Sequence, residues 1–203
     1  MENSISSGDE GRNRDSQSVI IYLTGKPGVG KYTIAKAIAK NYGYIVCDNQ
    51  LINNPIFELI QADGLTPIPN IAWKTIAKLR TIIFDFLSHF PHNSYVLTNN
   101  LYEDIDDRDL YEEVKAMTER RESLFVPVNI QINTKEHLKR VVDPKRRKRW
   151  KSINPKDVHD ETPLLSIDHP HLLNIDVSNL SPNEAAKTIV DYANKLKEEI
   201  YWN

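Results

Sequence analysis

The chain has 203 residues, of which 40% are hydrophobic and 27% are charged, and its formal net charge at pH 7 is −2. This length predicts one domain with a sizeable core, and the near-neutral charge argues against nucleic acid and anionic membranes as partners. The longest purely apolar run is Val19 to Leu23, far short of the roughly twenty residues of a membrane span. Cys47 is the only cysteine, which excludes an intrachain disulfide and fits a reducing, cytoplasmic location.

The first 17 residues, MENSISSGDEGRNRDSQ, are polar and show no apolar periodicity. This composition predicts a disordered tail at 1–17, followed by one domain at 18–203. The acidic start lacks the basic and apolar regions of a secretory signal.

Segments typical of strands alternate with segments typical of helices along the domain. The expected strands cover 19–23, 44–47, 95–98, 126–132 and 172–177, and the expected helices cover about 33–42, 73–90, 110–117, 134–143 and 182–200. The second of these helices has apolar residues at every third or fourth position, which predicts a core-facing stripe. The stripe comprises Trp73, Ile76, Leu79, Ile83, Phe86 and Phe90. A capping box of Ser181 and Glu184, with Pro182 between them, starts the last helix.

This alternation predicts an α/β fold, in which a five-stranded parallel sheet carries helices on both faces. Ligands of such sheets bind outside the carboxyl ends of the strands. Functional residues are therefore expected directly after each strand.

A glycine-rich loop follows the first strand and leads into a helix. It reads Gly25, Lys26, Pro27, Gly28, Val29, Gly30, Lys31, Tyr32, Thr33. Its glycines permit backbone angles that turn several N–H groups toward one anion, and the helix N-terminus adds its dipole. Lys31 supplies a mobile charge for the β- and γ-phosphates. The segment resembles the P-loop, or Walker A motif, of nucleotide triphosphatases and kinases, which implies that residues 25–33 bind ATP.

The loop departs from that motif at Tyr32, where the pattern has the Ser or Thr that ligates Mg²⁺. A phenol oxygen lies several ångströms further from the backbone and cannot ligate in the same way. Two other interpretations stay open: a glycine turn with a surface lysine, and a P-loop that binds nucleotide without catalysis.

Size and spacing select among P-loop proteins. The guanine-reading Asn-Lys-x-Asp of GTPases is absent, and no expected strand ends in paired acids as in larger ATPases. A basic segment before the last strand, together with the five-strand order, resembles the group of nucleoside-monophosphate kinases and shikimate kinases over roughly residues 18–200. The resemblance implies a three-layer P-loop NTPase fold with a lid insertion at about 142–163, an acceptor-binding region at about 48–92, and ATP and Mg²⁺ as cofactors. It also implies that the loop after the fifth strand, at Ser178 and Asn179, lies beside the adenine.

In that group, lid arginines neutralise the phosphoryl group in transfer. The corresponding residues here are Arg140, Arg146 and Arg147, from the helix after the fourth strand and the basic run that follows it. A solvated basic helix or a localisation signal is the alternative.

The acceptor is expected near Asp48, which ends the second strand and resembles the acidic residue that meets the acceptor hydroxyl or a metal-bound water in shikimate and gluconate kinases. The alternative for Asp48 is an N-cap, and for the neighbouring amides it is turn chemistry. The remaining substrate-binding candidates are Asn49, Asn53, Asn54, Arg80, Thr98, Asn99 and Asn100. The acceptor-binding region carries asparagines where nucleoside-monophosphate kinases carry arginines, so a neutral or polyhydroxylated acceptor is favoured.

The sequence thus predicts a kinase that transfers the γ-phosphoryl group of ATP to a small hydroxylated molecule. Lys31, Asp48 and the three arginines are its catalytic candidates, and no protein side chain is assigned as a metal ligand. A nucleotide or polynucleotide kinase and a non-catalytic nucleotide-binding module stay as alternatives. The six histidines are scattered and receive no role.

Overall fold

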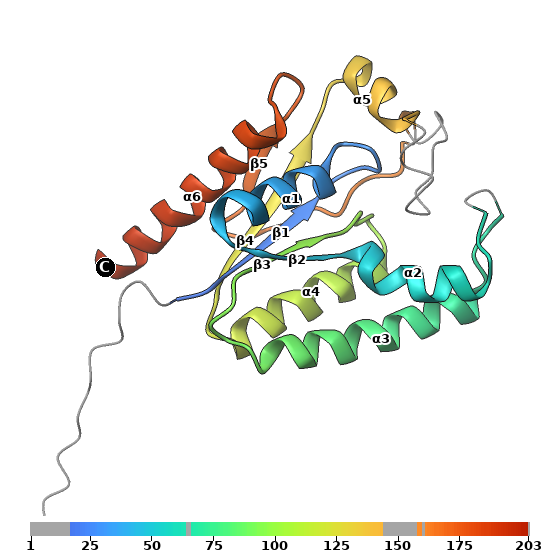
Figure 1. The fold of residues 1–203 in the computed structure, drawn as a ribbon, viewed down its shortest axis with the longest axis horizontal. Coiled ribbons are helices and arrows are strands. Elements are labelled where there is room, and N and C mark those ends of the chain that lie inside the picture. The colour runs from blue at the N-terminus through green and yellow to red at the C-terminus, as the bar shows by residue number, and fades with distance from the viewer. Residues whose placement is uncertain (1–16, 64–65, 144–157, 160, 203) are drawn as a thin grey trace, which may run out of the picture.

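The computed structural model of the chain describes residues 17–63, 66–143, 158–159 and 161–202 (Figure 1). The expected tail, apart from Gln17, lies outside the described residues. So does most of the expected lid, including Arg146 and Arg147.

Five parallel strands form one sheet in the order β2-β3-β1-β4-β5. The strands are β1 (Val19–Thr24), β2 (Ile45–Asp48), β3 (Tyr95–Thr98), β4 (Leu124–Gln131) and β5 (Leu173–Asp176). The predicted α/β class and the five-stranded parallel sheet are therefore confirmed. The central strand β1 is buried along its whole length, as its continuous β-branched and apolar sequence requires when helices cover both faces.

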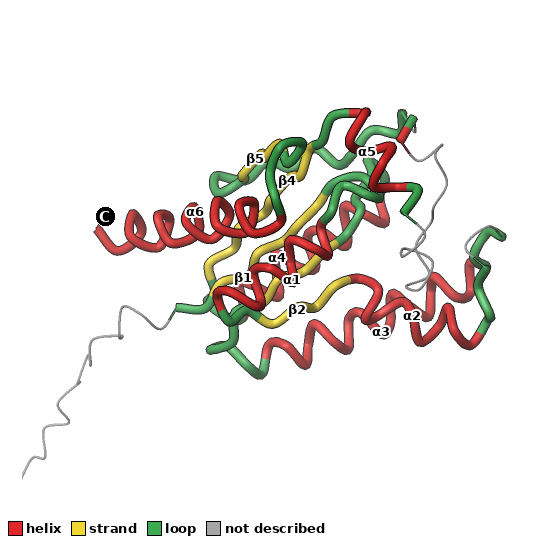
Figure 2. The backbone as a smooth tube through the Cα atoms, turned by 45° about the horizontal axis from the view of Figure 1, so that its top comes forward, coloured by secondary structure: helices red, strands yellow, loops and turns green. Residues whose placement is uncertain are grey.

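Six named helices connect or follow the strands. They are α1 (Lys31–Tyr42), α2 (Asn49–Leu59), α3 (Asn70–Ser88), α4 (Ile105–Arg120), α5 (Thr134–Val141) and α6 (Pro182–Trp202). Figures 1 and 2 show α1 and α6 on one face of the sheet, with α3 and α4 on the other. Each face has its own apolar core, and the side chains of β1 alternate between the two. The short helix α5 follows β4 at the carboxyl edge of the sheet, beside the loop between β1 and α1 (Figure 1).

The predicted capping box holds the start of α6. The Ser181 N–H donates to Oε2 of Glu184 at 2.8 Å, and the Glu184 N–H donates to the Ser181 hydroxyl at 3.2 Å. These reciprocal bonds satisfy two of the donors that a helix start leaves open. Their effect is to fix where the chain leaves β5 and enters α6.

The predicted stripe on α3 is partly wrong. Trp73 and Phe86 are 45% and 57% exposed, whereas Phe84 and Leu87 join Ile76 in the core. At 3.6 residues per turn, Phe86 and Phe84 lie about 80° round the helix from Ile76 on opposite sides, and only the side of Phe84 is covered. Phe90 lies beyond the helix end and is also exposed. Spacing of three or four residues alone did not separate the buried face from the side of the helix next to it.

Candidate active site

The glycine-rich loop connects the end of β1 to the first turn of α1, as the motif predicts. Gly25, Gly28 and Gly30 all have positive φ angles, of 136°, 94° and 109°. Gly30 is the N-cap residue of α1. The first N–H groups of the helix have no intrahelical partner, so they are available to an anion at this point.

Lys31 folds back over the loop that precedes it. Its Nζ atom donates to the backbone oxygens of Gly25 and Lys26, at 2.6 and 2.9 Å. It also donates to Oδ1 of Asn100, which follows β3, at 2.7 Å. The ammonium group therefore lies between the glycine-rich loop and the end of the neighbouring strand β3.

Tyr32 faces the groove between α1 and α2. Its ring lies under the ammonium group of Lys36, 5.8 Å from Nζ to the ring centroid. Together with Val46, Asp48 and side chains of α2, the ring lines a cavity of about 840 Å³. The phenol thus occupies the wall of this groove.

Asp48 is the last residue of β2 and is only 3% exposed. It occupies the N-cap position of α2, yet its side chain makes no capping hydrogen bond. Asp48 is therefore the N-cap residue by position, as the alternative expected, but without the capping hydrogen bond of that role. It lines the same groove as Tyr32. Because α2 begins at Asn49, directly after the strand, the helix start is held against the carboxyl edge of the sheet.

Three amide side chains of α2 lie near Asp48 with buried oxygens that lack a hydrogen-bond partner. They belong to Gln50, Asn53 and Asn54. Gln50 and Asn54 line the groove with Asp48. An unsatisfied buried amide oxygen is costly, and it is satisfied when a ligand donates an O–H or N–H. The unpartnered oxygens are themselves buried, so a ligand in the groove would reach those of Gln50 and Asn54 only if the side chains turned.

The end of β3 brings the other predicted substrate residues to the same edge. Thr98 pairs in register with Asp48 on one side and Leu23 on the other. The Asn99 N–H donates to the Leu23 oxygen at 3.1 Å, which extends the sheet by one step and directs Asn100 toward Lys31.

Arg80 is placed elsewhere. It is half-buried on α3, and its charge acts on Asp107 and Tyr22. Burial raises the pKa of Asp107, and the nearby guanidinium of Arg80 opposes that shift. Arg80 is not among the residues that line the groove beside Asp48, so its role in binding an acceptor stays a prediction.

Helix α5 touches the glycine-rich loop through two side chains. Nε2 of His137 lies 2.6 Å from the Pro27 oxygen, and Nη1 of Arg140 donates to the Val29 oxygen at 3.1 Å. Nη2 of Arg140 donates to the oxygen of Val177, after β5, at 3.2 Å. His137 is 4% exposed. Both residues therefore hold backbone oxygens of loops at the carboxyl edge.

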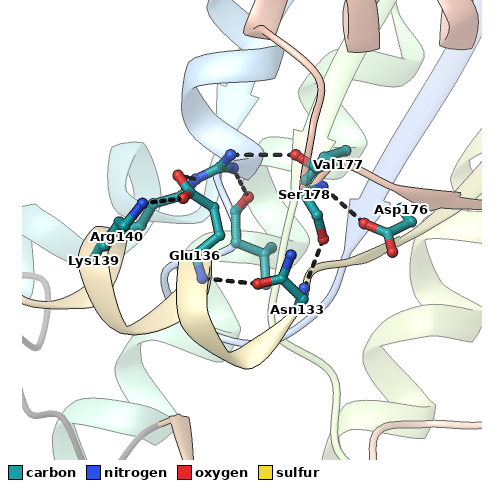
Figure 3. A network of polar contacts seen from close by, with 8 residues as sticks. Asn133, Glu136, Lys139, Arg140, Asp176, Val177 and Ser178 are labelled. Atoms are coloured by element: carbon teal, nitrogen blue, oxygen red, sulfur yellow. Dashed lines mark hydrogen bonds and ion pairs between the residues drawn. The ribbon is translucent and has the colours of Figure 1, made fainter.

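Figure 3 shows how α5 is itself fixed. Asn133 caps the helix by accepting from the Glu136 N–H at 2.9 Å, and its own N–H donates to the Ser178 hydroxyl at 2.7 Å. Glu136 accepts bonds from Lys139 and Arg140, which lower the pKa of its carboxyl group. The network ties α5 to the loop between β5 and α6.

A second, smaller cavity of about 210 Å³ adjoins the glycine-rich loop on the opposite side of α1 from the groove. Thr33 and Arg140 line it, together with Val177 and Ser181 at the start of α6. It lies next to the position where the resemblance places the adenine.

Sequence reasoning missed His137 and Gln50. The signal for His137 is its spacing of three residues from Arg140, because both then lie on one face of a helix that follows a ligand-side strand end. Gln50 lies two residues after Asp48, next to the candidate Asn49. Tertiary contact, rather than residue type, reveals both.

Metal-binding clusters and membrane-spanning helices were sought in the described part of the chain alone. Within it, no group of three or more His, Cys, Asp and Glu side chains gathers to hold a metal ion. No helix in the same residues is long and apolar enough to cross a bilayer. A Mg²⁺ ion that arrives with a nucleotide needs only one or two protein carboxylates, since phosphates and water complete its shell. Asp48 fits that limited requirement.

No family model matches the chain, and no curated protein matches its sequence. Solved structures do match its fold. A gluconokinase from Sinorhizobium meliloti 1021 aligns with a TM-score of 0.61 at 16% identity, covering 94% of this chain and 98% of that one. A shikimate kinase from Acinetobacter baumannii, in complex with shikimate, aligns with a TM-score of 0.53 at 16% identity, covering 90% and 96%.

A third match is a sugar kinase from Janibacter sp. HTCC2649, with a TM-score of 0.57 at 13% identity, covering 87% of this chain and 95% of that chain. An APS kinase from Mycobacterium tuberculosis, in complex with AMPPNP and APS, has a TM-score of 0.50 at 16% identity, covering 88% and 98%. The chain therefore has the fold of the P-loop small-molecule kinases. At 13–16% identity, this structural similarity shows the fold alone.

Proposed function

We propose that this chain is an ATP-dependent phosphotransferase whose acceptor is a small hydroxylated molecule. One observation carries the proposal above the others. Lys31 lies between the glycine-rich loop and Asn100, at the edge of the sheet where Asp48 also ends its strand. A lysine ammonium group and a carboxylate thus lie on the same edge of the sheet, which supports their assignment to the donor side and the acceptor side of a phosphoryl transfer.

The loop supports the donor side of this reaction. Backbone N–H groups at 28–31 and the start of α1 would hold the β- and γ-phosphates, and Lys31 would exchange its carbonyl partners for phosphate oxygens. The 210 Å³ cavity beside Thr33 has room for part of a nucleoside next to those phosphates. The APS kinase with the same fold holds AMPPNP, an ATP analogue, which supports ATP as the donor.

Asp48 and the amides of α2 support the acceptor side. A hydroxyl in the groove would donate to the Asp48 carboxylate, and the amide side chains of Gln50 and Asn54 would turn to bring their buried oxygens to the ligand. The acceptor oxygen then forms its bond to the γ-phosphorus while the bond to ADP breaks, and Asp48 takes the hydroxyl proton. When bound, Mg²⁺ neutralises phosphate charge, and Asp48 is the carboxylate of this site that would hold it.

Arg140 has different contacts from those expected of a lid arginine. Its guanidinium binds two backbone oxygens and Glu136. We propose that it orders the loop, and its charge-neutralising role stays a prediction, as do those of Arg146 and Arg147.

The direct experiment measures ADP formation from ATP and Mg²⁺ with a panel of neutral polyols, sugars and hydroxy acids. The panel includes nucleoside monophosphates and a 5′-hydroxyl oligonucleotide, because they represent the alternative kinase classes. We expect transfer to a member of the hydroxylated set, with the phosphate found on its hydroxyl oxygen. Transfer only to a nucleotide or an oligonucleotide end would contradict the proposed acceptor.

A non-catalytic module is the second candidate, and Tyr32 is the observation that favours it. The ring lies against Lys36 and lines the groove, so no hydroxyl takes the metal-binding place of the motif. ATP binding without turnover of any panel member, in the presence of Mg²⁺, would support this candidate instead.

A further inference from the structure

We propose that His137 is a positioning residue that, together with Arg140, holds the glycine-rich loop in its anion-binding conformation from outside. The inference concerns the loop to which the proposed function assigns the phosphates, and it rests on that function for its consequence in nucleotide binding. The clamp itself is defined by contacts that do not involve a nucleotide.

The first step is the direction of the two peptide groups that α5 holds. A peptide unit is planar and trans, so its C=O and N–H point to opposite sides of the chain. His137 binds the Pro27 oxygen and Arg140 binds the Val29 oxygen. The N–H groups on the far sides of those two peptide units belong to Gly28 and Gly30. Anchoring the oxygens against α5 therefore directs these two N–H groups away from it, into the space that the loop encloses.

The second step is the proton on His137. A backbone oxygen can only accept, so Nε2 must carry a hydrogen at its 2.6 Å distance from the Pro27 oxygen. The ring is 4% exposed, which keeps water from competing for this bond. A buried donor with one fixed acceptor holds that acceptor more firmly than a solvated side chain does.

The third step is how closely α5 packs on the loop. A Cβ atom at position 28 would lie 3.2 Å from Nε2 of His137 and 3.3 Å from Cβ of Val141. A Cβ atom at position 30 would lie 3.3 Å from Nη1 of Arg140. Both glycines also have positive φ angles. Positions 28 and 30 therefore favour glycine for two reasons: their positive φ angles and the close packing of α5.

The fourth step is the rigidity of the clamp. Helix α5 is capped by Asn133, whose N–H binds Ser178, and Arg140 binds the Val177 oxygen (Figure 3). The two side chains therefore extend from a helix that is fixed to the loop between β5 and α6. Because α5 is fixed in this way, its contacts with the glycine-rich loop fix the loop as well.

The test compares His137→Leu, which keeps the bulk and removes the donor, with His137→Gln, which restores an N–H donor. Lys135→Ala is the matched control, because Lys135 is exposed on the same helix. Hydrogen exchange of the nucleotide-free proteins is followed for residues 25–31 and for α6. We expect exchange to accelerate about tenfold at 25–31 in His137→Leu alone, with α6 unchanged.

ATP binding, measured by titration calorimetry, gives the consequence. We expect the Kd for ATP to rise about tenfold in His137→Leu, to recover to within about threefold in His137→Gln, and to stay unchanged in Lys135→Ala. A residue that merely stabilises the fold would lower the melting temperature and leave exchange at 25–31 and the Kd as they are. That result would overturn the inference.

Two further outcomes are informative. If the unaltered chain binds no ATP while His137→Leu still loosens residues 25–31, the proposed function fails and the clamp stands. If His137→Leu does not fold, Arg140→Met and Arg140→Lys replace it, since they remove and retain a cation at the second tether. Unchanged exchange at 25–31 in Arg140→Met would then overturn the inference.

Discussion

Nζ of Lys31 lies 2.7 Å from Oδ1 of Asn100, so the glycine-rich loop and the end of β3 meet at one charged contact. The two residues are 69 positions apart in the sequence. The parallel sheet brings them together because β1 and β3 are neighbours whose carboxyl ends share an edge. In the proposed reaction, the phosphate donor lies on the loop side of this contact and the acceptor lies on the side of Asp48.

Lys31→Ala tests the donor side. Removing the ammonium group removes the mobile charge for the β- and γ-phosphates, so we expect phosphoryl transfer to fall about a hundredfold or more. The circular dichroism spectrum should stay that of the unaltered chain, because the bonds of Lys31 to the Gly25 and Lys26 oxygens and to Asn100 lie in loops outside the helices and strands. Lys78→Ala, on the exposed surface of α3, is the control. Full activity of Lys31→Ala would contradict the proposed role of Lys31 in phosphoryl transfer.

Asp48→Asn tests the acceptor side. The substitution keeps the shape of a side chain that is 3% exposed and removes the base, so kcat should fall about a hundredfold or more. The affinity for ATP without Mg²⁺ should stay within about threefold, because Asp48 lies on the groove side of the loop. Asp85→Asn, exposed on α3, should behave like the unaltered chain. Steady-state kinetics that show an equal loss in both variants would contradict the role of Asp48.

Gly28→Ala and Gly43→Ala form a matched pair. Both glycines have positive φ angles, of 94° and 76°, yet a Cβ at position 43 meets nothing within 4 Å, whereas one at position 28 meets His137 and Val141. Each substitution should cost about 1–3 kcal/mol of stability through backbone strain, measured by urea unfolding. Only Gly28→Ala should also weaken ATP binding. Equal ATP affinity in the two variants would argue against α5 packing as a constraint on the loop.

Tyr32→Ser restores the hydroxyl of the motif. A serine oxygen at this position can ligate Mg²⁺ next to the phosphates, so Mg²⁺ should strengthen ATP binding about tenfold more in this variant than in the unaltered chain. Tyr32→Phe retains the ring that packs against Lys36 and should match the unaltered chain. Calorimetry at zero and millimolar Mg²⁺ measures the difference. Identical metal dependence in all three proteins would mean that position 32 does not decide metal handling.

Cys47 is predicted to be inert in the folded protein. It lies on β2 with its side chain in the core between the sheet and the helices of the α3 face. Burial raises the pKa of its thiol to about 12, and the thiolate is the reactive form. Reaction with a thiol reagent at pH 8 should therefore be slow until denaturant unfolds the chain, and it should then proceed at the rate of a free cysteine. Rapid labelling of the native protein would contradict the burial of Cys47.

The fold was predictable because local signals agree with each other. Continuous apolar strands, the capping box of Ser181 and Glu184, and the glycine-rich loop each specify a local structure, and only a parallel sheet accommodates all of them. The exposed side of α3 was not predictable in the same way, since Phe86 and Phe84 differ in burial through the positions of neighbouring helices. Apolar spacing does not contain that information.

The positions of two candidate residues were predictable. Asp48 ends β2 and Lys31 begins α1 after the glycine-rich loop, so both lie at the carboxyl edge of the sheet as expected, and their catalytic roles stay predictions. His137 was not predictable, because its role depends on the packing of α5 against a loop more than a hundred residues earlier in the chain. Arg140 was expected on the helix after the fourth strand, and it lies there on α5. Its bonds to the Val29 and Val177 oxygens appear only in three dimensions.

Titration calorimetry of the unaltered chain with ATP, with and without Mg²⁺, tests the central claim most directly. We expect ATP to bind to one site and Mg²⁺ to strengthen this binding, because Asp48 supplies a carboxylate although Tyr32 replaces the usual hydroxyl. Binding that is indifferent to Mg²⁺ would contradict the proposed transferase and favour a nucleotide-binding module. Absence of ATP binding would contradict both.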